Sequence, residues 1–313
     1  MNLKTKHILI IGGSGLLGRA LTDLLVEHGD HVTILSRNPD HVSFPTGVQV
    51  AKWDGRTTTG WESLVEVMDV VVNLAGHRIS GNHLGEIVFK RWTSKEKTLI
   101  LSSRVDTGHA IVQAIQNAKH KPEVLLQASA VGYYGPRGNE ELDEDAPSGN
   151  DFISDVCRQW EASTEKVVEW GIRRVVMRIG LVFTAHEGFL PVMTLPFRLF
   201  VGGKMGDGEQ YLSWIHIKDT VMSMRFLMDH GAGGIYNLSA PSPVTNAQFS
   251  KLAGRFLHRP NYLPLPEFVL KLIMGEKATL ALHGQRVIPR HLVEAGYSFQ
   301  FPELEAALES LLQ

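Results

Sequence analysis

The sequence has little of several features that would point to particular functions. Its 313 residues include one cysteine, Cys157, and carry a net charge of -2. A lone cysteine excludes an internal disulfide framework and a cysteine-based zinc cage, and it favours reducing, cytoplasmic surroundings. The small net charge provides no general attraction to nucleic acid or to an anionic membrane.

Long apolar runs and metal-ligand spacings are also missing. No run approaches the roughly 18 apolar residues of a membrane span, and the first one is too short for the core of a signal peptide. The 14 histidines show no spacing typical of metal ligands. We therefore predict neither a membrane contact nor a metal site.

What the sequence does contain is an alternation of short apolar runs with longer helical patterns. The apolar runs are His7–Ile11, His31–Ser36, Val48–Trp53, Val70–Leu74, Val124–Ala128 and Arg174–Ile179. Continuous apolar runs are typical of strands that helices cover on both faces. Helical patterns separate the runs, over about 17–28, 93–119 and 153–170. The predicted fold is therefore α/β, a doubly wound parallel sheet of the Rossmann type.

The texture changes after Gly180. We predict a dinucleotide-binding domain over 1–180, to which a helix and a strand near 214–240 return, and a substrate-side and C-terminal helical module over 181–313. Glycine, proline and aromatic residues are dense over Gly188–Trp214, which indicates loops and short elements. The acidic run Glu140–Asp145 is interpreted as a solvated loop.

A glycine-rich turn follows the first apolar run. Gly12, Gly15 and Gly18 form a Gly-x-x-Gly-x-x-Gly pattern between the first predicted strand and the first predicted helix. In that position, glycines let the backbone approach a pyrophosphate, which then lies at the positive end of the helix. The predicted cofactor contacts in this turn are Gly12, Ser14, Gly15, Leu16, Leu17 and Gly18.

The end of the second predicted strand distinguishes between the two nicotinamide cofactors. NAD sites place an acid there to hold the ribose, whereas NADP sites offer arginine to the 2′-phosphate. This chain has Ser36 and Arg37 and no acid. Arginine and serine can both donate to a phosphate. NADP(H) is therefore favoured, with NAD(H) as the alternative; a solvated surface arginine is the structural alternative for Arg37.

Several ordered motifs resemble the extended, nucleotide-sugar-epimerase-like short-chain dehydrogenases/reductases. Asn73–Gly76 is similar to the family's turn beside the adenine ribose, Ala128–Ala130 to its catalytic-serine strand end, and Gly206–Asp219 to its Trp-Ile-His-Val-x-Asp segment. Residues 259–313 resemble the C-terminal module of an atypical epimerase-family subgroup. The resemblance implies cofactor contacts from Leu74, Ala75, Gly76 and Leu181, and homodimerisation through the helices at 93–119 and 153–170.

The chain departs from that family at the residues that move protons. The family uses a Tyr-x-x-x-Lys pair, in which lysine lowers the pKa of tyrosine and tyrosine acts as general acid or base. Aligning Glu161 with a glutamate usual in the family puts Ile153 at the tyrosine position and Cys157 at the lysine position. Arg104 stands where an asparagine is usual. Of the family's four residues, the serine, tyrosine, lysine and asparagine, only the serine remains, as Ser129.

Five residues stay as catalytic candidates, each with a structural alternative. Ser129 could donate to an oxyanion or simply end a strand. Arg104 could contact the cofactor or lie on a helix surface. Tyr133 or Tyr134 could replace the missing acid or fill a pocket wall, and Cys157 could be reactive or an inert buried thiol. His216 is interpreted as structural.

These residues favour an NADP(H)-dependent oxidoreductase or epimerase-like enzyme. Its substrate would be a small polar carbonyl or alcohol, or a nucleotide-sugar-like molecule, and the cofactor would carry the hydride. The alternative is a non-catalytic NADP(H)-binding sensor or regulatory protein, since some relatives in the resembled subgroup are described as cell-division-inhibitor-like. The lost Tyr–Lys pair favours this alternative, whereas the cleft-forming segment at 180–219 favours the enzyme.

Overall fold

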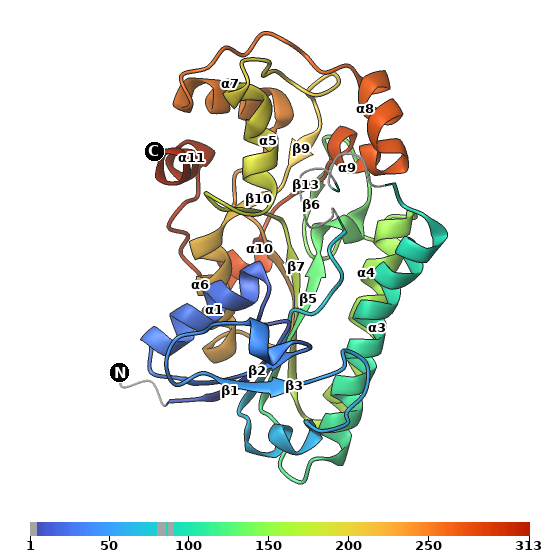
Figure 1. Cartoon of the computed structure of the whole chain (residues 1–313), viewed down its shortest axis with the longest axis vertical. Coiled ribbons are helices and arrows are strands. Elements are labelled where there is room, and N and C mark those ends of the chain that lie inside the picture. Colours follow the sequence, from blue (N-terminus) through green and yellow to red (C-terminus); the bar gives the residue numbers. More distant parts are fainter. Residues whose placement is uncertain (1–4, 80–85, 87–90) are drawn as a thin grey trace.

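The computed structural model is built on a seven-stranded sheet, and it describes residues 5–79, 86 and 91–313 (Figure 1). The strand order is β11-β7-β5-β4-β1-β2-β3, and every neighbouring pair is parallel. The strands are β1 (His7–Ile11), β2 (His31–Ser36), β3 (Gln49–Lys52), β4 (Val70–Asn73), β5 (Val124–Ala130), β7 (Arg173–Ile179) and β11 (Gly234–Leu238).

The predicted apolar runs become strands; those inside the sheet are covered on both faces, whereas the edge strand β3 is half-buried. Ile8 and Ile10 pack against Leu21 and Leu25 of α1 (Leu16–Glu27) and against α6 (Ile217–Asp229). On the other face, the alternate residues of β1 pack against α3 (Ser94–Asn117), with α4 (Phe152–Ala162) beside it. Alternation of side chains along a strand sends successive residues into the two layers. The predicted α/β fold class is confirmed.

The second half of the chain adds a smaller lobe above the carboxyl ends of the strands (Figure 1). Helices α5, α7 and α11 share an apolar cluster around Phe183 and Trp214. The helices of this lobe are α5 (Phe189–Arg198), α7 (Asn246–Phe256), α8 (Glu267–Met274), α9 (Thr279–Leu282) and α11 (Leu304–Leu312), whereas α10 (Arg290–Glu294) packs on β11 of the central sheet. The division of the chain into domains at residue 180 stays a prediction.

Six short strands pair two by two outside the central sheet. β8 (Leu181–Phe183) pairs with β10 (Trp214–His216), and β6 (Glu141–Leu142) pairs with β13 (Arg286–Val287), both in parallel. β9 (Tyr211–Leu212) pairs with β12 (Val244–Thr245) in antiparallel fashion. The β6–β13 pair joins the C-terminal segment to the loop after β5. The 3₁₀ segments are Pro39–His41, Glu62–Val67, Val131–Tyr134, Glu165–Trp170 and Gly275–Ala278.

The order of the strands places the site. It reverses between β1 and β4, because β2 and β3 lie on one side of β1 while β4, β5 and β7 lie on the other. Ligands of open parallel sheets bind at the carboxyl edge, at such a reversal. A ligand is therefore expected at the loops after β1, β4, β5 and β7. In the described part of the chain, no helix has both the length and the apolar character to cross a membrane.

Candidate cofactor and active site

The turn between β1 and α1 has no room for a side chain at Gly12 or at Gly18. Gly12 has φ +85°, and a Cβ there would lie 2.7 Å from the carbonyl carbon of Leu74. A Cβ on Gly18 would lie 2.5 Å from Cα of Gly13. Gly15 caps α1 without a side-chain hydrogen bond, so the amides of the first turn are left for a ligand. This cradle fits a pyrophosphate.

The predicted phosphate-binding residues lie together at the carboxyl edge of β1. Gly12, Ser14 and Gly15 belong to the turn itself, and Leu16, Leu17 and Gly18 form the first turn of α1. The β4 turn packs directly on this cradle through Leu74 and Ala75. The amide of Ala75 donates to Oδ1 of Asn73 at 3.2 Å, which holds the turn in place.

The end of β2 presents Arg37 to solvent. Its side chain lies beside Gly55, where an added Cβ would be 3.3 Å from Cδ of Arg37. Ser36 is buried, and its hydroxyl accepts a hydrogen bond from the amide of Asn38 at 3.2 Å. Of the two residues predicted to hold a 2′-phosphate, Arg37 is therefore the more accessible.

The buried side chain of Arg104 packs against the β4 turn. Its guanidinium packs on Gly76, where a Cβ would lie 3.0 Å from Cζ, and stacks on the ring of Trp160 at 4.8 Å. Nη1 donates to the carbonyl oxygens of Ile100 at 2.9 Å and His77 at 3.1 Å. Burial lowers the pKa of Arg104 to about 10, so the side chain stays charged at neutral pH. Nε is buried and has no partner among the described residues.

The two positions where tyrosine and lysine were expected lie on α4. A Cβ on Gly132 would lie 2.5 Å from Cγ2 of Ile153, so the isoleucine fills the space beside the loop after β5. Cys157 is buried with its Sγ 3.8 Å from the carbonyl oxygen of Ala130. Burial raises the pKa of this thiol to about 12. The thiolate, which is the reactive form, is scarce at neutral pH.

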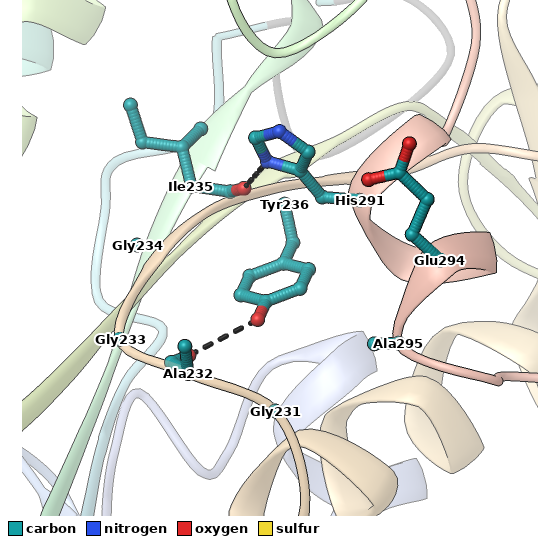
Figure 2. Close-up of a pocket in the computed structure, with 9 residues that line it drawn as sticks. All are labelled: Gly231, Ala232, Gly233, Gly234, Ile235, Tyr236, His291, Glu294 and Ala295. Carbon is teal, nitrogen blue, oxygen red and sulfur yellow. Dashed lines mark hydrogen bonds between the residues drawn. The ribbon is translucent and has the colours of Figure 1, made fainter.

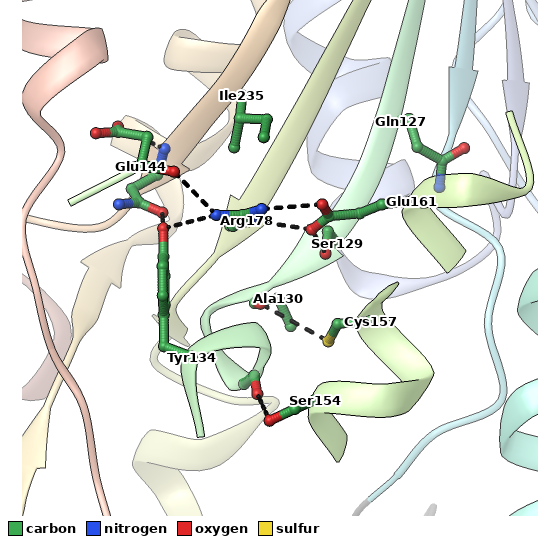
Figure 3. A network of polar contacts seen from close by, with 12 residues as sticks. Gln127, Ser129, Ala130, Tyr134, Glu144, Ser154, Cys157, Glu161, Arg178 and Ile235 are labelled. Carbon is green, nitrogen blue, oxygen red and sulfur yellow. Dashed lines mark hydrogen bonds and ion pairs between the residues drawn. The ribbon is translucent and has the colours of Figure 1, made fainter. Parts of the chain in front are cut away.

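Ser129 takes part in a buried polar network that sequence reasoning missed (Figure 3). Its hydroxyl donates to Oε1 of Glu161 at 2.6 Å, and its side chain is almost fully buried. Arg178 binds the same carboxylate with two hydrogen bonds, Nε to Oε1 at 2.9 Å and Nη2 to Oε2 at 3.0 Å. A hydroxyl has one hydrogen to donate. In this arrangement, Ser129 directs that hydrogen at Glu161.

The two tyrosines after β5 contact the same arginine. Arg178 Nη1 donates to the hydroxyl of Tyr134 at 3.1 Å, and that hydroxyl donates to Oδ1 of Asn237 at 2.7 Å. Burial raises the pKa of Tyr134 to about 12. The ring of Tyr133 lies under the guanidinium, 3.4 Å from ring centre to Cζ. Tyr134 is thus a structural anchor, and Tyr133 is half-buried beside it.

The interpretation of the acidic run as a solvated loop is wrong at β6, where Leu142 is buried, and at Glu144. Glu144 is buried, and its Oε1 accepts from the amides of Asn237 at 2.9 Å and His291 at 3.3 Å. Burial raises the pKa of this carboxyl. The partners are 93 and 147 residues away, so no residue near Glu144 in the sequence indicates these contacts.

Two further predicted residues lie in the upper lobe. Leu181 begins β8 directly after β7, and its side chain packs against the apolar cluster of that lobe. His216 is buried and caps α6, because its Nδ1 accepts from the amide of Lys218 at 3.0 Å while Nε2 contacts Ser310 Oγ at 3.2 Å. Burial lowers its pKa to about 4. The structural interpretation of His216 agrees with these contacts.

A surface hollow of about 390 Å³ lies elsewhere (Figure 2). Gly231 to Tyr236 line it together with His291, Glu294 and Ala295. These residues surround the amino end of β11, and the parallel strands put their carboxyl ends at the other edge of the sheet. The hollow is therefore not the cofactor site.

Two family models match the chain. Residues 8–239 match the NAD dependent epimerase/dehydratase family, and residues 265–311 match a domain of unknown function, DUF1731. The first match covers the whole central sheet together with the loops at its carboxyl edge. The second covers the segments α8 to α11, of which α10 packs on β11 of the central sheet.

Named relatives match over nearly the full length. The epimerase family protein YfhF of Bacillus subtilis (strain 168) is 39% identical over 98% of each chain. A crystal structure of the human epimerase family protein SDR39U1 (isoform 2) with NADPH is 35% identical, covers 98% of this chain and 99% of that one, and has a TM-score of 0.85. A UDP-glucose 4-epimerase from Thermotoga maritima, solved with UDP-glucose, is 16% identical with a TM-score of 0.78 and shares the fold.

Proposed function

The chain belongs to the NAD dependent epimerase/dehydratase family, and from that premise we propose that it is an NADP(H)-dependent oxidoreductase or epimerase-like enzyme. Its substrate would be a small polar carbonyl or alcohol, or a nucleotide-sugar-like molecule. The observation that carries the proposal is the cradle at Gly12 to Gly18, where backbone packs on backbone and side chains would clash. When bound, the cofactor would supply hydride transfer.

Each part of the dinucleotide has a counterpart in the chain. The free amides at the start of α1 would hold the pyrophosphate. Arg37, exposed at the end of β2, would pair with the 2′-phosphate. The β4 turn at Ala75 and Gly76 would lie along the ribose. Support for NADP(H) over NAD(H) comes from Arg37 and from the human relative, whose structure holds NADPH.

A second function is favoured by one observation. Ile153 cannot transfer a proton, and Cys157 and Tyr134 are buried groups with a pKa of about 12. A non-catalytic NADP(H)-binding protein that reports the redox state would need none of these groups to react. The two functions share the cofactor and differ in whether bound NADPH is ever oxidised.

The cofactor preference is tested by titrating the protein with NADPH and NADH. One charge-assisted phosphate contact is worth about 1.5–3 kcal/mol, so NADPH should bind roughly 10- to 100-fold more tightly. Arg37→Asp should remove that preference, whereas Lys251→Asp on the exposed side of α7 should leave it unchanged. Equal affinities for NADPH and NADH in the parent protein would contradict the assignment.

The reaction class is tested by NADPH absorbance with a panel of small aldehydes, ketones and nucleotide sugars. Oxidation of NADPH that depends on both protein and acceptor would support the enzyme. If the protein binds NADPH but no acceptor oxidises it, the non-catalytic function is the correct one.

A further inference from the structure

A histidine–carboxylate pair lies at the β4 turn, next to the cofactor cradle. His77 follows Gly76 directly, and its Nε2 lies 2.8 Å from Oε1 of Glu96 in the first turn of α3. Both side chains keep some contact with solvent, at 26% and 16% exposure. Nδ1 of His77 contacts no hydrogen-bonding group among the described residues. One imidazole nitrogen is thus held while the other remains available.

The backbone fixes the position of His77 firmly. Its amide donates to Oγ of Ser103 at 2.9 Å, and its carbonyl oxygen accepts from Nη1 of Arg104. Glu96 is fixed as well, because its amide donates to Oγ1 of the capping residue Thr93 at 3.2 Å. The positive end of α3 favours a carboxylate in that first turn. The loop after β4 therefore fixes His77, and the first turn of α3 fixes Glu96.

The pair lies on the side of the sheet where the reacting half of a dinucleotide would lie. The pyrophosphate cradle touches the backbone of Leu74 and Ala75, and His77 is two residues further along the same turn. Because the strand order reverses between β1 and β4, a dinucleotide that crosses the reversal has one half above β1 to β3 and the other above β4 to β7. The turn up to Gly76 would lie beside the adenine ribose, and His77 leaves it toward the second half, where its backbone contacts Ser103 and Arg104 of α3, the helix that packs beside α4.

The pair also lies near the position that lost its tyrosine. The ring of Phe152, next to Ile153, stacks edge-on against Trp92 at 5.5 Å, and Lys97 lies over it at 4.9 Å. Trp92 Nε1 in turn donates to the carbonyl oxygen of Ile79 at 3.3 Å. The start of α4, the segment just before α3 and the backbone of Ile79 therefore pack together.

We propose that His77, held by Glu96, exchanges the proton with the substrate oxygen in place of the missing tyrosine; this rests on the proposed oxidoreductase function. As the carbonyl carbon accepts the hydride from NADPH, the carbon–oxygen π pair passes to the oxygen, which takes the Nδ1 proton of the imidazolium. The products are the alcohol and NADP⁺, and water returns a proton to His77. Glu96 is a positioning residue that stabilises the imidazolium.

The first test needs no turnover. Diethyl pyrocarbonate acylates unprotonated imidazole, and mass spectrometry locates the modified histidines with and without NADPH. At NADPH ten times its Kd, we expect modification of His77 to slow by about tenfold through mass action. His109, exposed on the same helix as Glu96, is the internal control and should react equally in both samples. An unchanged rate at His77 while NADPH binds would overturn the inference.

The second test uses variants with para-nitrobenzaldehyde and NADPH, and then the fastest acceptor of the panel. His77→Gln keeps a donor toward Glu96 but cannot give up a proton, so kcat should fall by about 10²–10⁴, while the Kd for NADPH and the KM for the acceptor stay near parent values. Glu96→Gln should lower kcat less, Glu96→Asp should recover part of the loss, and His109→Asn should match the parent.

The outcomes separate this inference from the proposed function. If the parent protein does not bind NADPH, or if none of the tested acceptors oxidises the bound NADPH, the proposed function is overturned and this inference with it. An active parent whose His77→Gln variant keeps full kcat overturns the role of His77 alone. Loss of NADPH affinity in His77→Gln would mean that the residue supports the cofactor site and not the proton transfer.

Discussion

The two halves of the carboxyl edge of the sheet are built from different material. Beside β1 and β4 backbone packs on backbone, with Gly12 against Leu74 and Ala75. Beside β5 and β7 buried side chains interlock, with Glu161 binding both Ser129 and Arg178. The first, which we call the backbone half, exposes backbone amides to a ligand. In the second, the side-chain half, the polar side chains form hydrogen bonds with one another.

The difference shows which half can recognise a ligand without rearranging. Amides at a helix start have no internal partners, so a phosphate meets them at little cost. The groups of the β5–β7 half are already hydrogen-bonded and desolvated, and freeing one of them would leave a buried partner unsatisfied. That contrast makes His77, which has an available nitrogen, a better proton donor than Ser129 or Tyr134.

The largest expected effect comes from breaking the side-chain half. Glu161→Ala would leave the guanidinium of Arg178 buried without its carboxylate. Removing one partner of a buried pair costs about 3–5 kcal/mol in the free energy of unfolding. Urea unfolding followed by circular dichroism measures this loss.

The matched control removes both charges. Glu161→Leu combined with Arg178→Met should destabilise the protein much less than Glu161→Ala alone, since no charge is left unpaired. If the single variant is as stable as the parent, the pair does not hold this half of the site together.

The next largest effect is expected on NADPH binding, when a side chain is added to the glycine-rich turn of the backbone half. Gly15 has φ −76°, which any residue adopts, and an added Cβ would meet only the carbonyl oxygen of Gly12, at 3.3 Å, so Gly15→Val should cost less in the free energy of unfolding than a substitution at Gly12. Its side chain would occupy the space of the pyrophosphate and weaken NADPH binding by about 100-fold or more, or about 2.7 kcal/mol. Fluorescence titration beside urea unfolding separates the two quantities.

A contrasting variant sharpens that result. Gly12 has φ +85° and backbone neighbours at 2.7 Å, so Gly12→Val should lose stability as well as NADPH binding. Unchanged NADPH affinity in Gly15→Val would mean that the turn is not the cofactor site.

The backbone half could be predicted from the sequence, and the side-chain half could not. The cradle is local: Gly12, Gly15 and Gly18 lie within one strand-turn-helix unit, and the reasons for each glycine act over a few residues. Ser129 was recognised only through its resemblance to the family's catalytic serine at a strand end. Its partner Glu161 lies 32 residues away, and Tyr134 meets Asn237 across 103 residues. Spacing along the chain carries no signal for such contacts.

The helix α5 shows a second limit. Its sequence contains Pro191 and Pro196, and the stretch around it was predicted to form loops and short elements. Pro191 falls in the first turn, where no backbone N–H is needed, and Pro196 gives up one bond near the end. Burial of Leu190, Thr194 and Phe197 against the upper lobe stabilises the helix despite the lost bond.

A smaller effect is expected on the pH dependence of stability, through two buried ionisable groups of the side-chain half. Cys157 and Tyr134 have raised pKa values of about 12 when folded, so the unfolded chain loses these protons first as the pH rises. Stability is then fully present below about pH 8.5 and falls toward pH 12, with a slope of up to about 1.4 kcal/mol per pH unit for each group. Urea unfolding from about pH 8 to 10.5 measures the slope, and Cys157→Ala should flatten it. An equal slope in that variant would place the thiol in contact with water.

The smallest effect is expected at Ser129, where the two halves meet. Ser129→Ala removes one hydrogen bond to a carboxylate that keeps both of its bonds to Arg178, so the free energy of unfolding should fall by about 1–2 kcal/mol. NADPH affinity should not change, because the cradle lies beside β1 and β4. The sequence alone favoured Ser129 as an oxyanion donor, whose loss would cost about 10²–10³ in turnover. With its only hydrogen directed at Glu161, we expect a loss of less than about tenfold. A larger loss in the NADPH absorbance assay would show that the hydroxyl leaves Glu161 for the substrate, and the side-chain half would then belong to the chemistry as well as to the scaffold.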